Sequence, residues 1–158
     1  MIHGFLKACT VSPALRVADC AFNTQQTIAA MQRAAADGVQ LAVFPELGLT
    51  GYTCGDLFFQ QPLQRAAAKG LAAVLEASAD LDLVALVGLP VTVDGKLYNC
   101  AAVVCHGKLL GLVPKTYLPN YGEFYERRQF NPAPAGVRTL HSVSYTHLRA
   151  HETRGNLV

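Results

Sequence analysis

Two ionisable residues stand at places in the sequence where catalysis is common. Glu46 follows the apolar run 40–44 and a proline, and Lys115 follows the apolar run 109–113 and a proline. A carboxylate at the end of a buried strand can serve as a general base, because partial burial raises its proton affinity. A lysine at a second strand end could stabilise an oxyanion and favour a nearby thiolate. The ordinary alternatives are a solvated carboxylate at the start of a loop and a surface lysine.

A neighbouring thiol is one nucleophile that such a pair could activate. All five cysteines precede Lys115 in the sequence: Cys9, Cys20, Cys54, Cys100 and Cys105. Their number is odd, their spacing is irregular and most fall in apolar runs, which indicates buried thiols of a reduced protein. Cys54, in a glycine-flanked loop after Glu46, has the most favourable position for a nucleophile. Three histidines in the segment 141–151 are irregularly spaced and pair with no cysteine, so we expect no metal site.

Composition restricts the class of protein. The 158 residues are 51% hydrophobic and 15% charged, which is typical of one globular α/β domain. A net charge of +2 argues against a nucleic-acid or acidic-membrane partner. No run approaches the roughly 18 apolar residues of a membrane span, and no signal peptide is indicated at the start. We therefore expect a cytoplasmic protein with no membrane partner.

The elements that would position Glu46 and Lys115 can be predicted from periodicity and turn residues. Asn23 and Gln26 form a capping-box pattern that predicts the start of a helix, and Asp37-Gly38 predicts its end. Asp94-Gly95 predicts a type I′ hairpin. The pattern predicts strands at 4–11, 40–44, 83–90, 97–105 and 109–113, a second helix at 62–79, and an irregular segment at 116–130. The order β-α-β-α-β-β-β is that of a layered α/β domain, parallel at first and then a meander.

The pattern ends near residue 132. We place the domain at 1–132 and interpret 133–158, which begins with a proline-rich and alanine-rich stretch, as an unstructured or non-native tail.

Longer motifs surround both candidate residues. They are Glu46-Leu47-Gly48-Leu49-Thr50-Gly51-Tyr52-Thr53-Cys54-Gly55-Asp56-Leu57-Phe58, Val87-Gly88-Leu89-Pro90, Leu97-Tyr98-Asn99-Cys100-Ala101 and the run from Pro114 to Phe130. Together they resemble the carbon–nitrogen hydrolase (nitrilase) superfamily. The resemblance covers roughly residues 4–132 and is closer to one branch, the glutaminase domains of glutamine-dependent NAD synthetases.

The resemblance implies a fold, a reaction and roles. The fold would be the N-terminal half of an α-β-β-α sandwich, with apolar surface and sheet edges left exposed. Glu46 would be the general base of a Glu-Lys-Cys triad, Lys115 would stabilise the tetrahedral intermediate, and Glu123 would orient substrate and lysine. Tyr121 and Phe124 would line a pocket for glutamine, whose amide would be hydrolysed through a thioester.

The resemblance also implies parts outside this chain. In that branch ammonia passes to an ATP-dependent synthetase domain, so ATP and Mg would bind there, and this chain would hold no cofactor. The full-length protein would be a homo-oligomer. Two alternatives stay open: another amidase or carbamoylase of the superfamily, and a catalytically inert fragment, because no cysteine follows Lys115.

Overall fold

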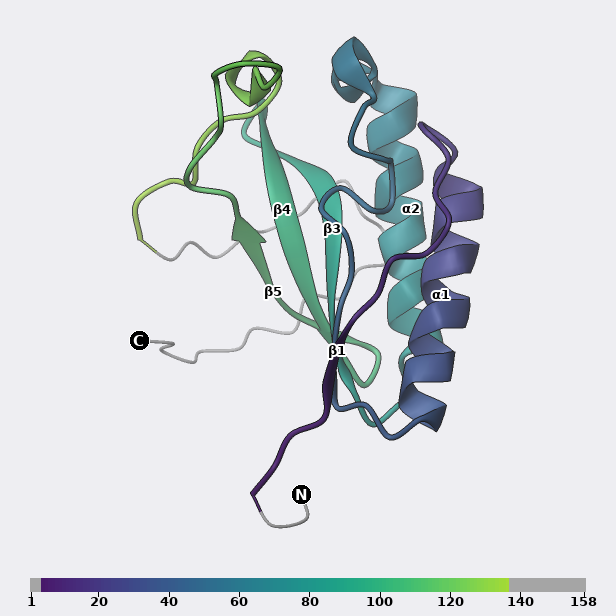
Figure 1. The fold of residues 1–158 in the computed structure, drawn as a ribbon. Helices are drawn as coiled ribbons and strands as arrows, with labels where there is room; N and C mark the ends of the chain where they lie inside the picture. Colours follow the sequence, from purple (N-terminus) through teal and green to yellow (C-terminus); the bar gives the residue numbers. More distant parts are fainter. Residues whose placement is uncertain (1–3, 137–158) are drawn as a thin grey trace.

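The structure, a computed structural model, describes residues 4–136 (Figure 1). The predicted boundary at residue 132 is not tested by it, and the part of the tail at 137–158 lies outside the described residues. The elements along the chain are β1 Ala8–Thr10, α1 Cys20–Ala36, β2 Leu41–Val43, the short 3₁₀ turn η1 Gly55–Phe59, α2 Gln61–Ala77, β3 Val84–Val93, β4 Lys96–Cys105, β5 Lys108–Pro114 and the 3₁₀ turn η2 Glu126–Arg128.

The strands form one sheet in the order β1-β2-β3-β4-β5. The first three strands are parallel and the last two pairings are antiparallel, which confirms the predicted order and topology. Both antiparallel connections are two-residue turns with positive φ at each position, at Asp94-Gly95 and at His106-Gly107. This is the backbone of a type I′ turn, whose twist matches that of the flanking strands. The first strand is shorter than the predicted range of 4–11.

Helices α1 and α2 cover one face of the sheet. Alternate strand residues point toward them, among them Ala85, Val87 and Leu89 of β3 and Ala102 and Val104 of β4, all of them buried. They pack against apolar residues of both helices, namely Ala30, Met31, Ala34, Leu71, Val74 and Leu75. No helix within residues 4–136 combines the length and the apolar character needed to cross a membrane.

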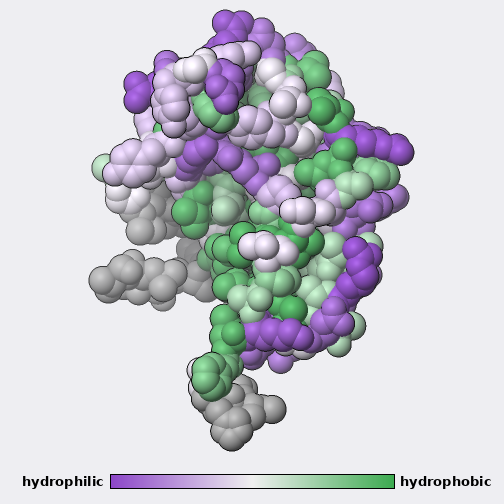
Figure 2. All heavy atoms as spheres, viewed as in Figure 1, coloured by the Kyte–Doolittle hydropathy of each residue, from purple (hydrophilic) through white to green (hydrophobic). Residues whose placement is uncertain are grey.

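The opposite face of the sheet carries apolar residues that no described helix covers. Leu86 and Val103 are half-buried, whereas Leu110 and Val113 of β5 are 45% and 59% exposed. Figure 2 shows apolar residues gathered in the middle and lower part of this view and polar residues at the top. The exposure that the resemblance implied is therefore present in the described part of the chain.

Helix α1 begins earlier than its sequence predicted. The side chain of Asp19, not that of Asn23, accepts a hydrogen bond from the amide of Phe22 at 3.0 Å and caps the helix. Asn23 is fully buried, and its side chain bonds both the amide and the carbonyl of Arg16 at 2.8 Å. The prediction of Asn23 as the cap was wrong because its polar side chain satisfies the backbone before the helix. The predicted end is confirmed, since Asp37 is the C-cap and Gly38 has a φ of 74°.

Gly88 sets the distance between β3 and the turn that carries Glu46. A Cβ atom at Gly88 would collide with the backbone nitrogen of Leu47 and the carbonyl oxygen of Pro45. The Gly88 carbonyl in turn accepts a hydrogen bond from the amide of Leu49 at 3.1 Å. The turn therefore lies directly on the strand, and only glycine permits this approach.

Replacing Gly88 by alanine should therefore displace the turn and lower the free energy of unfolding by about 1–3 kcal/mol. Gly111→Ala is the matched control, because Gly111 also lies in a strand and a Cβ there meets no atom within 4 Å. Urea unfolding followed by circular dichroism measures both variants. Equal effects of the two substitutions would contradict the close approach at Gly88.

Candidate active site

The turn after β2 presents Glu46 at the end of the sheet where the parallel strands have their carboxyl ends. The amide of Phe44 donates to Leu86 at 2.9 Å, which continues the β2–β3 ladder to the start of the turn. Leu47 adopts the left-handed conformation with a φ of 51° and is buried, and the amide of Gly48 closes the turn onto Pro45 at 3.1 Å. The Glu46 side chain is 42% exposed, so it can be reached by a ligand.

The end of β5 presents Lys115 toward the same end of the sheet. The amide of Lys115 donates to the carbonyl of Asn99 at 2.8 Å, so the residue still lies beside β4. The carbonyl of Lys115 accepts from the amide of Ala133 at 3.0 Å. Two backbone bonds thus fix this residue, and its side chain is 29% exposed.

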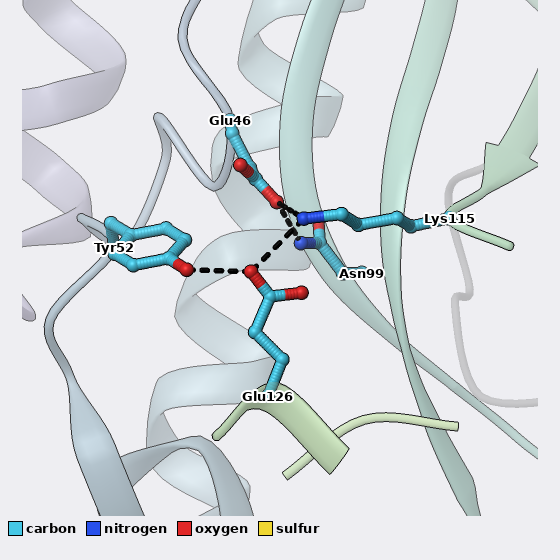
Figure 3. Close-up of polar contacts among 5 residues, drawn as sticks. All are labelled: Glu46, Tyr52, Asn99, Lys115 and Glu126. Carbon is cyan, nitrogen blue, oxygen red and sulfur yellow. Dashed lines mark hydrogen bonds and ion pairs between the residues drawn. The ribbon is translucent and has the colours of Figure 1, made fainter. Parts of the chain in front are cut away.

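The Lys115 ammonium lies between two carboxylates (Figure 3). Nζ donates to Oε1 of Glu46 at 2.7 Å and to Oε1 of Glu126 at 2.9 Å. Asn99 donates through Nδ2 to the same oxygen of Glu46 at 2.5 Å. The structure therefore brings Glu46 and Lys115 together as the sequence predicted, and it adds Asn99 and Glu126.

Glu126 is buried and is held by one of its two oxygens. Its side chain is 6% exposed, and Oε1 accepts from the Tyr52 hydroxyl at 2.5 Å as well as from Lys115. Oε2 is buried and has no hydrogen-bond partner among the described residues. A buried carboxylate needs a countercharge, and Lys115 supplies it.

Segments 51–59 and 125–130 are joined at several points around Glu126. The Arg128 guanidinium binds the carboxylate of Asp56 through two hydrogen bonds of 3.0 and 2.8 Å. The rings of Phe58 and Phe130 meet edge to face with centroids 5.0 Å apart. These contacts set the position of η2, the turn on which Glu126 lies.

The charges shift the proton affinity of two groups in the cluster. Burial alone would lower the pKa of Lys115, but its hydrogen bonds and its attraction to Glu46 and Glu126 outweigh burial and raise that pKa. Burial, followed by the hydrogen bond to Glu126, raises the pKa of Tyr52 well above its ordinary value. Lys115 is therefore a cation and Tyr52 a neutral donor at neutral pH.

The cysteines of the core are held as neutral thiols. Burial raises the pKa of Cys20 to about 11 and that of Cys100 to about 12. Burial also raises the pKa of Cys54, whose thiol donates to the carbonyl of Thr50 at 3.1 Å. Since the thiolate is the reactive form, none of these three cysteines is suited to attack a substrate. The favourable sequence position of Cys54 thus does not make it a nucleophile.

Three predicted site residues lie apart from the ion-paired cluster. Glu123 is exposed, and among the described residues the ion pairs of Lys115 are with Glu46 and Glu126. Tyr121 is exposed, and its ring packs against that of Phe124 at 6.1 Å. Glu123 and Phe124 line a cavity of about 180 Å³ beside Glu126 and Tyr52. The roles of Glu123, Tyr121 and Phe124 stay predictions.

Sequence reasoning missed the roles of Asn99 and Glu126. Asn99 is a buried polar residue of β4, a strand whose other buried residues are apolar. Its polar side chain was the signal that could have marked it as part of a site. Glu126 follows Tyr125 in an irregular segment, where no periodicity distinguishes it from Glu123. Tyr52, in the motif that follows Glu46, donates its hydroxyl to Glu126.

The fold is a three-stranded parallel sheet extended by two hairpins, and a Glu-Lys pair lies at one end of its strands. These features define the class to which the protein belongs, the carbon–nitrogen hydrolases. A sequence model of the carbon–nitrogen hydrolases matches residues 7–153, and the chain belongs to this family. A glutamine-dependent NAD(+) synthetase of Mycobacterium tuberculosis is 41% identical over 138 residues, which are 87% of this chain and 20% of that protein. A synthetase of the same name from Thermotoga maritima is 40% identical over 110 residues, 70% of this chain and 19% of that protein. The chain thus spans about a fifth of the length of these relatives.

Solved structures share the fold. The glutamine-dependent NAD(+) synthetase of Cytophaga hutchinsonii superimposes with a TM-score of 0.79 and 28% identity, over 85% of this chain and 23% of that chain. An amidase from Nesterenkonia sp. superimposes with a TM-score of 0.68 and 22% identity, over 87% of this chain and 51% of that chain. The nitrilase-type fold predicted from the sequence is confirmed.

Replacing Lys115 by methionine removes the cation that both carboxylates share. We expect the free energy of unfolding at neutral pH to fall by about 1–3 kcal/mol, less than for a fully buried pair because the lysine is partly exposed. The deficit should shrink in strong alkali. Because the pKa of Lys115 is raised, the stabilisation that its charge contributes is complete below the ordinary lysine pKa and is lost as the pH rises through the raised pKa.

Chemical denaturation of both proteins from acid to alkaline pH measures this difference. The double variant Lys115→Met/Glu126→Gln is the control, because it removes the buried charge that Lys115→Met leaves unpaired, and it should recover part of the loss. A deficit that does not change with pH would show that packing of the lysine stem, not charge, accounts for it.

Proposed function

We propose that residues 4–136 supply the general base and the charged groups of a glutamine amidohydrolase, the ammonia-producing part of a glutamine-dependent NAD synthetase. The observation that carries this proposal is the placement of Lys115 between Glu46 and Glu126. The relatives at 41% and 40% identity, which carry that name, support the choice of glutamine over other amides.

In this proposal Glu46 is the base. Its Oε1 is occupied by Asn99 and Lys115, whereas its Oε2 has no hydrogen bond to a described residue and is available for a thiol proton. The thiolate attacks the amide carbon of glutamine, and the Lys115 ammonium stabilises the negative oxygen of the tetrahedral intermediate. Glu46 returns the proton to the leaving nitrogen, ammonia departs, and water hydrolyses the γ-glutamyl thioester to glutamate.

The thiol would come from outside the described residues. Cys20, Cys54 and Cys100 are buried with raised pKa values, and the cluster of Glu46, Lys115 and Glu126 has no hydrogen bond to a described cysteine. A structure of the Nesterenkonia amidase carries an acetamide group added covalently at its active-site cysteine. By analogy we place the nucleophile on polypeptide that this family has beyond the part described here.

The proposed glutamine pocket lies beside the cluster. Tyr121 and Phe124 would contact the aliphatic part of glutamine, and the carboxylate of Glu123, at the rim of the same 180 Å³ cavity, would pair with its α-ammonium group. The cavity adjoins Glu126, so the amide end of the ligand would lie toward the charged cluster.

ATP and Mg would act in a further domain. Within residues 4–136 no group of three histidine, cysteine or acidic side chains is arranged to hold a metal ion. Ammonia formed at Lys115 would pass to that domain for the amidation of deamido-NAD, and the full-length protein would be a homo-oligomer.

The alternative of a catalytically inert fragment rests on two observations. The sequence contains no cysteine after Lys115, and the three core cysteines are unreactive by burial. In that case the charged cluster would stabilise the fold without chemistry. The alternative of another amidase or carbamoylase differs only in the substrate.

The decisive experiment is to read the source DNA beyond the codon for Asn131 and to assay the longest product of the gene for ammonia release. We expect release from glutamine and a loss of about 10²- to 10⁴-fold in kcat/KM for Glu46→Gln, since a positioned general base contributes about that much. Release from simple amides in preference to glutamine would favour the other amidases. A gene that encodes only the 158 residues, with no release, would support the inert fragment.

The same gene product tests whether Glu126 or Glu123 is the second glutamate that the reaction needs. Glu126→Gln should lower kcat at least tenfold, because it removes one of the two charges that hold Lys115. Glu123→Gln is the matched variant three residues earlier, and we expect it to change mainly KM. The opposite ranking of the two effects on kcat would restore Glu123 to the role that the sequence predicted.

A further inference from the structure

The hydroxyl of Tyr52 is outside the Glu-Lys pair, yet it lies in the same network. It donates to Oε1 of Glu126 at 2.5 Å, and that oxygen also accepts from Lys115 (Figure 3). We propose that Tyr52 is a positioning residue, which holds the Glu126 carboxylate so that Lys115 stays in line with Glu46. This inference deepens the proposed function and rests on it for its consequence in catalysis.

The backbone around Tyr52 does not depend on this hydroxyl. The amide of Gly51 donates to Leu47 at 2.8 Å, and the thiol of Cys54 donates to Thr50. On the other side, η2 is held by the two hydrogen bonds between Arg128 and Asp56. The hydroxyl therefore affects the direction of one carboxylate, while other contacts maintain the fold.

Glu126 needs such a donor because its carboxylate is held at a single oxygen. Oε2 has no partner among the described residues, so only Tyr52 and Lys115 oppose rotation about the last side-chain bond. Lys115 is flexible and is shared with Glu46, whereas a tyrosine ring has only two rotatable bonds. Removal of the hydroxyl leaves the mobile partner alone to orient the carboxylate.

The consequence for the lysine follows from geometry. When Glu126 rotates, one of the two anionic contacts of the Lys115 ammonium weakens, and Nζ has more freedom beside Glu46. In the proposed reaction this ammonium must meet the oxyanion at a fixed place, so its mobility would lower kcat more than it would raise KM.

The test uses nuclear magnetic resonance on the purified 158-residue chain. The ammonium signal of Lys115 is identified by its absence in Lys115→Met, and its hydrogen exchange is measured in Tyr52→Phe. We expect exchange to be about fivefold faster, the order of effect of one lost hydrogen bond. Tyr117→Phe is the matched control, because Tyr117 is 88% exposed and lies two residues from Lys115, and it should leave the exchange unchanged.

Unchanged exchange in a folded Tyr52→Phe chain would overturn the inference and leave Tyr52 a packing residue. If that variant does not fold, Glu126→Gln examines the same hydrogen bond from the other side. The raised pKa of Tyr52, followed by phenolate absorbance, should then fall toward the ordinary value of about 10. A Tyr52 pKa that Glu126→Gln leaves as high as before would also overturn the inference. Neither readout requires glutamine, so both remain decisive if the gene product proves not to be a glutaminase.

Discussion

The ion pairs of one ammonium group connect the parts of this structure. Lys115 joins Glu46, in the turn after β2, to Glu126, in an irregular segment near the end of the described chain. Because Glu126 is buried, its charge would be costly without the lysine, so the two segments are tied by electrostatics as well as by packing. The turn at Gly88, the hairpins that place Lys115 beside β4, and the contacts around η2 all serve to bring both carboxylates within 3 Å of the Lys115 ammonium.

The elements with local signals could be predicted from sequence, and those defined by distant contacts could not. The Asp94-Gly95 turn and the buried runs gave the strand order, and strand ends gave Glu46 and Lys115, because local chemistry determines each of these. Asn23 was mistaken for a helix cap because its buried hydrogen bonds to Arg16 have no signature in the helix pattern. Glu126 was missed because three charged residues follow one another in 126–128 without a period, and only the fold shows which of them faces Lys115.

The motif that linked this sequence to the synthetase branch has a structural explanation. Tyr52, Asp56 and Phe58, all in the segment 51–59, contact Glu126, Arg128 and Phe130 by a hydrogen bond, an ion pair and a ring contact. The three contacts follow the same order along both segments, so the two segments lie side by side. Loss of the Arg128–Asp56 ion pair or of the Phe58–Phe130 contact would move η2, and with it the charge that Glu126 presents to Lys115.

The open face of the sheet and the proposed site each need a partner that the described residues do not supply. Helices α1 and α2 bury one face, while apolar residues such as Leu110 and Val113 remain exposed on the other. In the proposed function the site likewise has a base, a cation and an orienting carboxylate, but the thiols of Cys20, Cys54 and Cys100 are held neutral in the core. Apolar surface is stabilised by whatever covers it, and a base without a nucleophile requires a partner for its chemistry. In the proposed function a single segment that covers the open face of the sheet would also carry the cysteine to Glu46, and so would meet both needs.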